Sequence, residues 1–317
     1  MAARRSIAAL LLGLALAGFL AGGVALFWRP ATVAGPDAYA DAVSRGEALF
    51  GRGDYDGAIS TFTDAIRIRP RDPQAYDWRG AAERRKGQLD RAITDCTAAI
   101  RLDAKYSDAY ETRAWAYEDK GDLDQAIRDL TAAIDVEGRA AYYCFRGSAY
   151  EKKGELHRAI ADYTEAIRIW PDDAAAYSGR ASVYEHGGDL TKAVKDYAEA
   201  IRLNPTNPTA YARRGHAREK AGDLGGAIAD LGEAIRLAPG EATPYFSRGL
   251  VRCKRREYKE AIADFNTGLR LSPNDGLAVY SRGIAYCNLG EVARGEADLA
   301  RAIELGYRPP QGPRANE

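Results

Sequence analysis

The sequence has 317 residues, of which 45 are basic and 45 are acidic, so its formal net charge is zero. A chain without excess positive charge lacks the attraction that holds proteins on nucleic acid or on anionic membrane surfaces, and composition therefore argues against a nucleic-acid partner. The length alone would suggest about two domains, unless the chain is built from repeats, in which case length counts copies.

An apolar segment lies near the amino terminus. Residues 7–28 are 22 consecutive uncharged and mostly apolar positions, preceded by Arg4 and Arg5. A helix of this length, at about 1.5 Å per residue, can span a bilayer. The two arginines favour a cytoplasmic amino terminus at 1–6, which predicts a single-pass anchor in a bacterial inner membrane with the remaining chain facing the periplasm. Ala15-Leu16-Ala17 matches a small-residue cleavage site, so a cleaved signal peptide and a soluble periplasmic protein are the alternative.

Three further features concern the two ends of the chain. Residues Gly18 and Gly22 form a small-xxx-small spacing, which is compatible with a homodimer through the anchor and also arises by chance in a segment rich in Ala and Gly. Residues 29–38, with several Pro and Gly, predict a short linker. The tail 308–317 has no apolar periodicity, which predicts an extended or disordered segment.

One pattern recurs eight times, about every 34 residues, from Tyr39 to Tyr307. The consensus of the copies combines Tyr-x-x-Arg-Gly with a later Ala-Ile-x-Asp-Tyr-x-x-Ala-Ile-Arg, which gives two helical periods and no strand signal. A unit of this size cannot bury its apolar face alone and must stack on its neighbours. The pattern predicts one continuous all-α solenoid over 39–307. Its copies are 39–72, 73–106, 107–139, 140–173, 174–207, 208–241, 242–275 and 276–307.

Fixed positions within each copy predict a helix, a tight turn, a second helix and a second turn. Positions 8 and 20 are always Gly or Ala, which lets two helices approach closely, while position 24 carries a larger residue such as Phe62 or Tyr163 that fills the gap beside them. Gly at position 15 ends the first helix, an Asp such as Asp54 caps the second, and a Pro such as Pro70 ends it.

This combination of positions resembles the tetratricopeptide repeat family over about 85% of the chain. The resemblance implies a right-handed superhelix of about eight helix-turn-helix repeats, whose first helices line a concave groove that holds peptides or protein segments. One position departs from the family pattern, because position 7, commonly Leu in the family, is Arg in every copy.

The arginines at position 7 predict ion pairs within the scaffold rather than a ladder for phosphate or carboxylate ligands. Position 23, on the second helix, is Asp in seven copies and Thr61 in the first. Arg can offer a bidentate fork to a carboxylate, so opposite charges recurring on two packed helices favour pairing. The predicted pairs are Arg79 with Asp95, Arg113 with Asp129, Arg146 with Asp162, Arg180 with Asp196, Arg214 with Asp230, Arg248 with Asp264 and Arg282 with Asp298.

The resemblance places positions 2, 5, 9, 12 and 13 of the first helix on the groove. The groove residues expected to contact a partner are Glu111, Trp115, Glu118, Glu151, Glu185, Glu219, Phe246, Leu250, Tyr280 and Ile284. The middle of the groove is therefore mixed with an acidic bias, and its carboxy-terminal end is apolar. An exposed apolar cluster is either a partner site or a surface covered by the chain's own tail. The groove lacks the Asn residues of the family's carboxylate-clamp members, which argues against a chaperone-tail adaptor.

Catalytic and metal-binding patterns are missing from the sequence. The four cysteines, Cys96, Cys144, Cys253 and Cys287, are expected to be free thiols, because the last two occupy one position in adjacent copies, about 8–10 Å apart and beyond disulfide reach. The three histidines have no metal-site spacing and no nucleophile partner. We therefore expect no enzyme activity, no cofactor and no small-molecule substrate.

Two functions follow from these expectations. The first is a membrane-anchored scaffold that binds a protein partner in the groove. The second is a structural spacer subunit of a larger envelope assembly, whose groove is covered by its own tail or by another copy.

Overall fold

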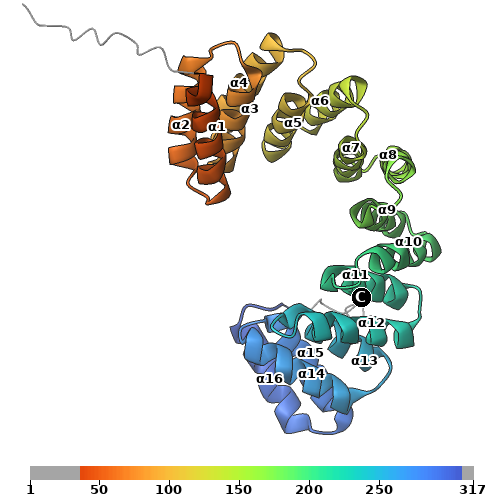
Figure 1. The fold of residues 1–317 in the computed structure, drawn as a ribbon. Coiled ribbons are helices and arrows are strands. Elements are labelled where there is room, and N and C mark those ends of the chain that lie inside the picture. The colour runs from red at the N-terminus through yellow and green to blue at the C-terminus, as the bar shows by residue number, and fades with distance from the viewer. Residues whose placement is uncertain (1–35, 309–317) are drawn as a thin grey trace, which may run out of the picture.

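The structure, a computed structural model, describes residues 36–308. Within them every regular element is an α-helix, and the helices follow one another as helix-turn-helix pairs (Figure 1). The all-α repeat solenoid expected from the sequence is confirmed. The helices are α1 Pro36–Gly51, α2 Tyr55–Ile68, α3 Pro73–Arg85, α4 Leu89–Leu102, α5 Ser107–Asp119, α6 Leu123–Val136, α7 Ala140–Lys152, α8 Leu156–Ile169, α9 Ala174–His186, α10 Leu190–Leu203, α11 Pro208–Lys220, α12 Leu224–Leu237, α13 Ala242–Lys254, α14 Tyr258–Leu271, α15 Gly276–Leu289 and α16 Val292–Glu304.

The predicted membrane segment, residues 7–28, lies outside the described residues, together with its cleavage site and its Gly18 and Gly22 spacing. Most of the linker 29–38 and the tail from 309 onward lie outside them as well. Across 36–308, none of the helices combines the length and the apolar character that crossing a bilayer requires.

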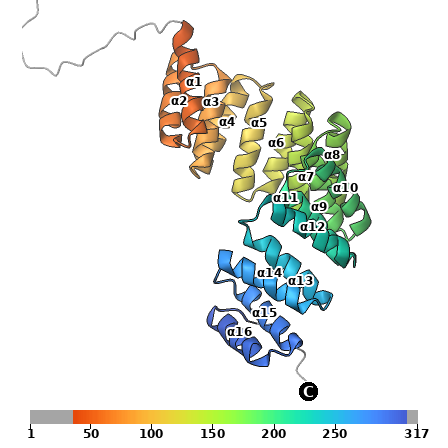
Figure 2. The same ribbon diagram turned by 60° about the horizontal axis from the view of Figure 1, so that its bottom comes forward.

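The pairs stack into a curved array with two layers. Each helix packs on the next one in the chain, and α3 also contacts α5, as α7 contacts α9. Figure 1 shows a C-shaped arc, in which α5, α7 and α9 lie on the inner side and α6, α8 and α10 on the outer side. Figure 2 shows the same order of pairs from a second direction. The first helices of the repeats therefore form the concave face.

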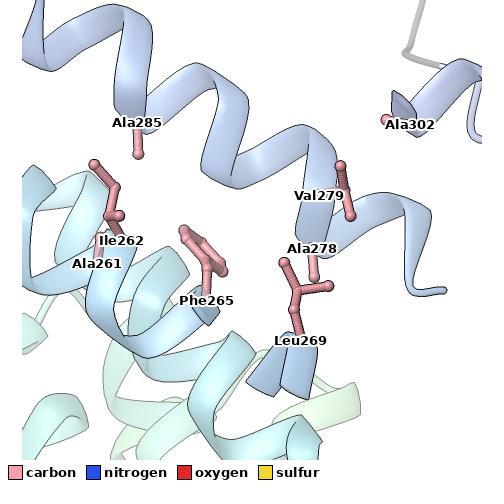
Figure 3. Packing of buried hydrophobic residues seen from close by; sticks show 8 residues of the cluster. All are labelled: Ala261, Ile262, Phe265, Leu269, Ala278, Val279, Ala285 and Ala302. Carbon is pink, nitrogen blue, oxygen red and sulfur yellow. The ribbon is translucent and has the colours of Figure 1, made fainter. Parts of the chain in front are cut away.

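Small residues at position 8 set the spacing within each pair. A side-chain carbon added to Gly249 of α13 would lie 2.9 Å from Cε1 of Phe265 on α14, closer than such contacts occur, so glycine and the buried phenylalanine depend on each other. Figure 3 shows how the next pair joins this core, with Ile262, Phe265 and Leu269 of α14 facing the Ala278 to Ala285 side of α15. The core thus continues from repeat to repeat.

The turn between the two helices of a pair requires a left-handed residue. Glycine holds this position in most repeats, as Gly188 does with φ of 81°. In the seventh repeat the residue is Arg256, with φ of 63°, and it is the one non-glycine residue with positive φ in the part of the chain that the structure describes. A residue with a Cβ is strained in this conformation by roughly 1 kcal/mol.

Candidate functional site

The arginines at position 7 are held within the scaffold. From the second repeat to the eighth, Nε and Nη2 of each arginine donate to the two carboxylate oxygens of the aspartate at position 23, at 2.6–3.0 Å. These pairs join the two helices of one repeat, and we call them the intra-repeat pairs. Their members are Arg79 and Asp95, Arg113 and Asp129, Arg146 and Asp162, Arg180 and Asp196, Arg214 and Asp230, Arg248 and Asp264, and Arg282 and Asp298.

The remaining guanidinium nitrogen reaches the preceding repeat. Nη1 of Arg113 donates to Oγ1 of Thr97 at 2.9 Å, and Arg79, Arg146, Arg180 and Arg282 make the equivalent bond. Three of the five N–H donors of each of these arginines are therefore used within the scaffold. A carboxylate on one side and a hydroxyl or amide on the other fix the guanidinium, which does not fit a free ladder for ligands.

In the sixth and seventh repeats the bond to the preceding repeat is missing, and a second arginine binds the aspartate instead. In the repeats that precede them, the corresponding residues 198 and 232 are Ala and Gly, which offer no side-chain acceptor. Instead, Arg218 Nη1 donates to Oδ2 of Asp230 at 2.9 Å, and Arg252 Nη1 donates to Oδ2 of Asp264 at 2.7 Å. The two aspartates are buried, so the extra arginine compensates their charge more fully.

A second set of contacts joins the repeats along the concave face. The side chain at position 12 of one first helix pairs with the side chain at position 13 of the next, and we call these contacts the inter-repeat pairs. They are Arg84 with Asp119 at 3.3 Å, Glu118 with Lys152, Glu151 with His186 at 2.9 Å, Glu185 with Lys220 at 2.6 Å, and Glu219 with Lys254 at 2.7 Å.

The inter-repeat pairs involve four of the predicted groove residues, which are therefore not free to bind a partner as expected. Glu118, Glu151, Glu185 and Glu219 lie on the concave face, yet each carboxylate has a basic partner in the following repeat. Glu151 also accepts a hydrogen bond from the Ser182 hydroxyl at 2.8 Å. These four residues therefore link repeats and leave little free negative charge for a ligand.

Free negative charge is concentrated farther toward the amino terminus, on α3 and α5. Asp77, Asp108 and Glu111 lie close enough there to affect one another's ionisation, and we call them the acidic cluster. Arg139 binds Asp108 at 2.8 Å and also Glu137 at 2.6 Å, so its charge is shared. Glu111 makes no hydrogen bond or ion pair with any residue of 36–308.

The acidic cluster disfavours ionisation of its own members. Burial, and then the Asp108 carboxylate, raise the pKa of Asp77 to about 6, although the Thr112 and Tyr106 hydroxyls oppose the shift. Burial, Asp108 and Asp77 raise the pKa of Glu111 to about 7, against the opposing charge of Arg139. Carboxyl groups with such shifts on a concave surface mark a candidate ligand site.

Trp115, another predicted groove residue, lies one helical turn beyond Glu111 on α5. Its ring meets Phe145 of α7 edge to face, with 5.3 Å between ring centroids. The Arg84 guanidinium lies 5.0 Å from the ring centroid on the side of α3. The indole is thus half-buried and fixed by both neighbouring repeats.

The middle of the concave face has small side chains. Positions 2, 5 and 9 of α7 and α9 carry Ala141, Cys144, Ser148, Ser178 and Ser182, each exposed or half-buried. Short side chains leave space above the inner helices, in which larger side chains of a bound segment can be accommodated.

The carboxy-terminal end of the concave face is apolar. Leu250 of α13 and Ile284 of α15 are 36% and 38% exposed, while Phe246 and Tyr280 are half-buried against the core of α14 and α15. Tyr307 packs on Tyr280, with 4.9 Å between ring centroids. The chain after α16 therefore covers part of this surface and leaves the two aliphatic side chains open.

The cysteines and histidines of the described chain are dispersed, although His216 Nε2, for which the sequence indicated no nucleophile partner, lies 3.1 Å from the Ser247 hydroxyl. All four cysteines are free thiols, and burial raises the pKa of Cys253 to about 11 and that of Cys144 to about 12, so neither is a thiolate at neutral pH. Residues 36–308 contain no group of three His, Cys, Asp or Glu that could hold a metal ion.

Two features were missed by the reasoning from sequence. Asp77 was not among the expected groove residues, although it occupies position 5, as Glu111 does. The inter-repeat pairs were not foreseen either, but the signal was present, because the charges at positions 12 and 13 reverse together between Arg84 with Asp119 and Glu118 with Lys152.

Glu83 is a further residue that the sequence did not single out. It occupies position 11, where the sixth and seventh repeats have Arg218 and Arg252. Its buried Oε2 has no hydrogen-bond partner within the described chain. Burial, and then the nearby Asp95, raise the pKa of Glu83 to about 7. The second repeat therefore holds a carboxyl group where a cation would compensate Asp95.

Comparison with known families and structures identifies the repeat. The model of the tetratricopeptide repeat matches residues 43–107, 111–174, 146–208 and 212–276, which together span more than half of the chain. The comparison with curated protein sequences gives no match.

Solved structures of similar shape come from several repeat proteins. The carboxy-terminal part of a repeat protein from Cytophaga hutchinsonii is 22% identical, with a TM-score of 0.60. The match covers 75% of this chain and 98% of that chain. A tetratricopeptide repeat protein from Parabacteroides merdae is 20% identical, with a TM-score of 0.57 and coverages of 78% and 99%. The chain matched in the APC/C hetero-tetramer Cut9-Hcn1 is 18% identical, with a TM-score of 0.57. The match covers 78% of the present chain but only 52% of the matched chain. At these identities the likeness shows the fold alone.

Proposed function

Because the chain belongs to the tetratricopeptide repeat family, we propose that it is a non-enzymatic scaffold that binds an extended protein segment along its concave face. The observation that carries the proposal is the order of surfaces along that face. An acidic cluster on α3 and α5 is followed by small side chains on α7 and α9 and by exposed apolar side chains on α13 and α15. A segment lying along the first helices would meet a cation-binding, a permissive and an apolar surface in turn.

The apolar end supplies the hydrophobic contribution to such binding. Leu250, Leu277 and Ile284 are 36%, 48% and 38% exposed and belong to successive first helices. Single exposed apolar residues are ordinary on protein surfaces, but neighbouring ones on a concave surface favour a partner site. We expect an aliphatic or aromatic side chain of the partner to bind there.

We propose in addition that residues 7–28 anchor the scaffold in a bacterial inner membrane, with the repeats in the periplasm. The length and apolar character of this segment and the preceding Arg4 and Arg5 support the proposal. Extraction of membranes with carbonate tests it, because an anchored chain needs detergent for release. Release without detergent, together with a shortened amino terminus, would favour the cleaved alternative.

The scaffold function is tested by comparing two triple variants of the full chain. One carries Leu250→Ser, Ile284→Ser and Ser148→Arg on the concave face. The matched control carries Arg128→Ser, Arg168→Ser and Arg202→Ser on exposed positions of second helices. Proteins that co-purify with the native chain should be lost from the first variant and retained by the second. Equal retention by both, at equal folded content, would move recognition away from the concave face.

A structural spacer is the second candidate function, and one contact favours it. Tyr307 already packs on Tyr280, so the chain after α16 turns toward the apolar end of the concave face. Deletion of residues 306–317 tests this function through binding of a hydrophobic dye. A large increase in dye fluorescence supports self-cover, whereas an unchanged signal leaves the surface open to a partner.

A further inference from the structure

The acidic cluster differs from the other charged groups of the concave face in its charge balance. Every carboxylate of the inter-repeat pairs has a basic partner in the adjacent repeat. In the cluster, Arg139 binds Asp108 and acts on Glu111 but also binds Glu137, and no basic side chain of the described residues acts on Asp77. The cluster therefore has an excess of negative charge that the described chain does not neutralise.

Asp77 shows most clearly that a partner is missing. It is 7% exposed, and its Oδ1 is buried without any hydrogen-bond partner in residues 36–308. Its Oδ2 receives the Tyr106 hydroxyl at 3.5 Å, the outer limit of a hydrogen bond, and the Thr112 hydroxyl also lies near the carboxylate, but both groups are neutral. An ionised carboxylate in such a place is unfavourable unless a cation compensates it.

Neighbouring residues fix the cluster rather than neutralise it. Tyr142 of α7 donates its hydroxyl to Ser107 at 3.0 Å and approaches Asp108 at 3.2 Å. Ser107 in turn donates to Glu137 at 3.2 Å. These contacts hold Asp108 in position from two repeats while adding no positive charge, as expected of a preorganised site.

The geometry points to a subsite for a Lys or Arg side chain of the bound segment, formed by Asp77, Asp108 and Glu111. Ammonium and guanidinium groups carry the missing charge and only donate hydrogen bonds, which matches carboxylates with unused acceptor capacity. A metal ion is a poorer match, since the described residues offer no suitable ligand group for one. This inference rests on the proposed function, because the basic side chain belongs to the segment bound on the concave face.

Trp115 extends the subsite toward the middle of the concave face. Glu111 and Trp115 are four residues apart on α5, so their side chains project from the same side of the helix. The ring already accepts the Arg84 guanidinium at 5.0 Å. The alkyl part of an incoming basic side chain therefore has an aromatic surface beside the carboxylates.

Protonation of the cluster should weaken binding of a basic segment. Burial raises the pKa of Asp77 to about 6 and that of Glu111 to about 7, so lowering the pH from 8 to 5.5 neutralises both in the free protein. The other titratable and charged groups around the cluster are Cys96 of α4, Asp72, Tyr106 and Asp108 near α3 and α5, and Glu137, Arg139 and Tyr142 near the start of α7.

The subsite is tested by selecting peptides from a displayed library of random 12-residue sequences for binding to the full chain in detergent micelles. The native chain is compared with Asp77→Asn/Glu111→Gln, which keeps shape and removes two negative charges. The control Asp90→Asn/Glu165→Gln removes two carboxylates from the second helices α4 and α8. Circular dichroism establishes equal folding of all three proteins.

Selection on the native chain and on the control should yield peptides with Lys or Arg at one fixed place relative to an apolar residue. The cluster variant should lose that enrichment. For one selected peptide, measured by fluorescence anisotropy, the cluster variant or replacement of the basic residue by glutamine should weaken binding about 10- to 100-fold, the effect expected for a hydrogen bond to a charged group.

The outcomes separate the subsite from the proposed function. Peptides that bind the native chain without a fixed basic residue, and equally well to the cluster variant, would overturn the subsite and leave the scaffold function standing. If no peptide is enriched by any of the three proteins, the concave face does not bind extended segments, and the proposed function fails together with the subsite.

Discussion

Glu185 of α9 accepts a hydrogen bond from Lys220 of α11 at 2.6 Å, across the boundary between two repeats. The same relationship recurs at four other boundaries, with the charges reversed between Arg84 and Asp119. The charged residues of the concave face thus serve two purposes. Most connect one first helix to the next, and we propose that the acidic cluster serves recognition.

The inter-repeat pairs should contribute little stability individually. Lys220 is 57% exposed while Glu185 is 12% exposed, so water and salt screen their attraction. We expect Glu185→Gln to lower the free energy of unfolding by about 0.5–1 kcal/mol, and less at high salt. Urea unfolding of the variant beside Glu199→Gln, which affects an exposed pair within one helix, provides the measurement. A loss of several kcal/mol would contradict this assignment.

The intra-repeat pairs should be far more sensitive to loss of one partner. Asp129 is buried, and both its oxygens are bound by Arg113 at 2.7 and 2.8 Å. Arg113→Ala leaves that carboxylate buried and unpaired, so we expect a cost on the order of 3–5 kcal/mol. Arg113→Leu combined with Asp129→Leu should be much closer to native stability, because it removes both charges. Equal losses in the single and the double variant would show that the pair does not carry the effect.

Arg256 should be replaceable by glycine with a gain in stability. Its φ of 63° is accessible to glycine without strain, and the same turn position holds Gly222 and Gly290 in neighbouring repeats. We expect Arg256→Gly to raise the free energy of unfolding by about 0.5–1 kcal/mol. Arg255→Gly is the matched control, because Arg255 has φ of −82° and binds Glu257 at 3.0 Å, so it should be neutral or destabilising. Thermal unfolding of both variants decides the point.

Stability should fall as the pH rises from about 5 to about 7.5. The pKa of Asp77 is raised to about 6, and those of Glu83 and Glu111 to about 7, chiefly by burial. Since the unfolded chain releases these protons at lower pH, the folded chain binds more protons in this window. Deprotonation of each group therefore destabilises the folded chain, by on the order of 1 kcal/mol per pKa unit for the buried Asp77 and Glu83 and by less for the partly exposed Glu111.

Glu83→Gln should flatten this pH dependence, and Glu83→Arg should raise stability at pH 7.5 by reproducing the contact of Arg218 with Asp230. The control is Glu165→Gln, an exposed carboxylate whose pKa is lowered by Arg168 and which does not titrate in this window. Denaturation curves at pH 5.5, 6.5 and 7.5 would show the effect. If the free energy of unfolding of the native chain rises with pH over this range, ionisation of these groups does not destabilise the folded chain, and the prediction is wrong.

The sequence was sufficient to predict the scaffold because the same residue types recur at the same positions of each repeat. Glycine at position 8 and a larger residue at position 24 occur together, as Gly249 and Phe265 do, and the structure packs them within one pair. Arginine at position 7 and aspartate at position 23 likewise meet in one repeat. Periodic positions reveal such contacts because their partners lie at a constant separation along the chain.

Contacts that vary between repeats were harder to foresee. Whether Glu118 is free or paired depends on Lys152 in the next repeat and on the position of α7 relative to α5, which no single copy encodes. The acidic cluster depends on Asp77 of the second repeat meeting Asp108 and Arg139, which lie at opposite ends of the third repeat. The ends of the chain add contacts outside the period, such as Tyr307 on Tyr280.

The central claim, that partners bind on the concave face, is tested most directly by site-specific photo-crosslinking in intact cells. A photoreactive phenylalanine analogue is placed at Trp115 or Leu250 on first helices, and at Arg128 or Arg202 on second helices. We predict that one protein crosslinks from both concave positions and from neither of the other two. Crosslinks confined to the second helices, with none from positions 115 and 250, would contradict the claim.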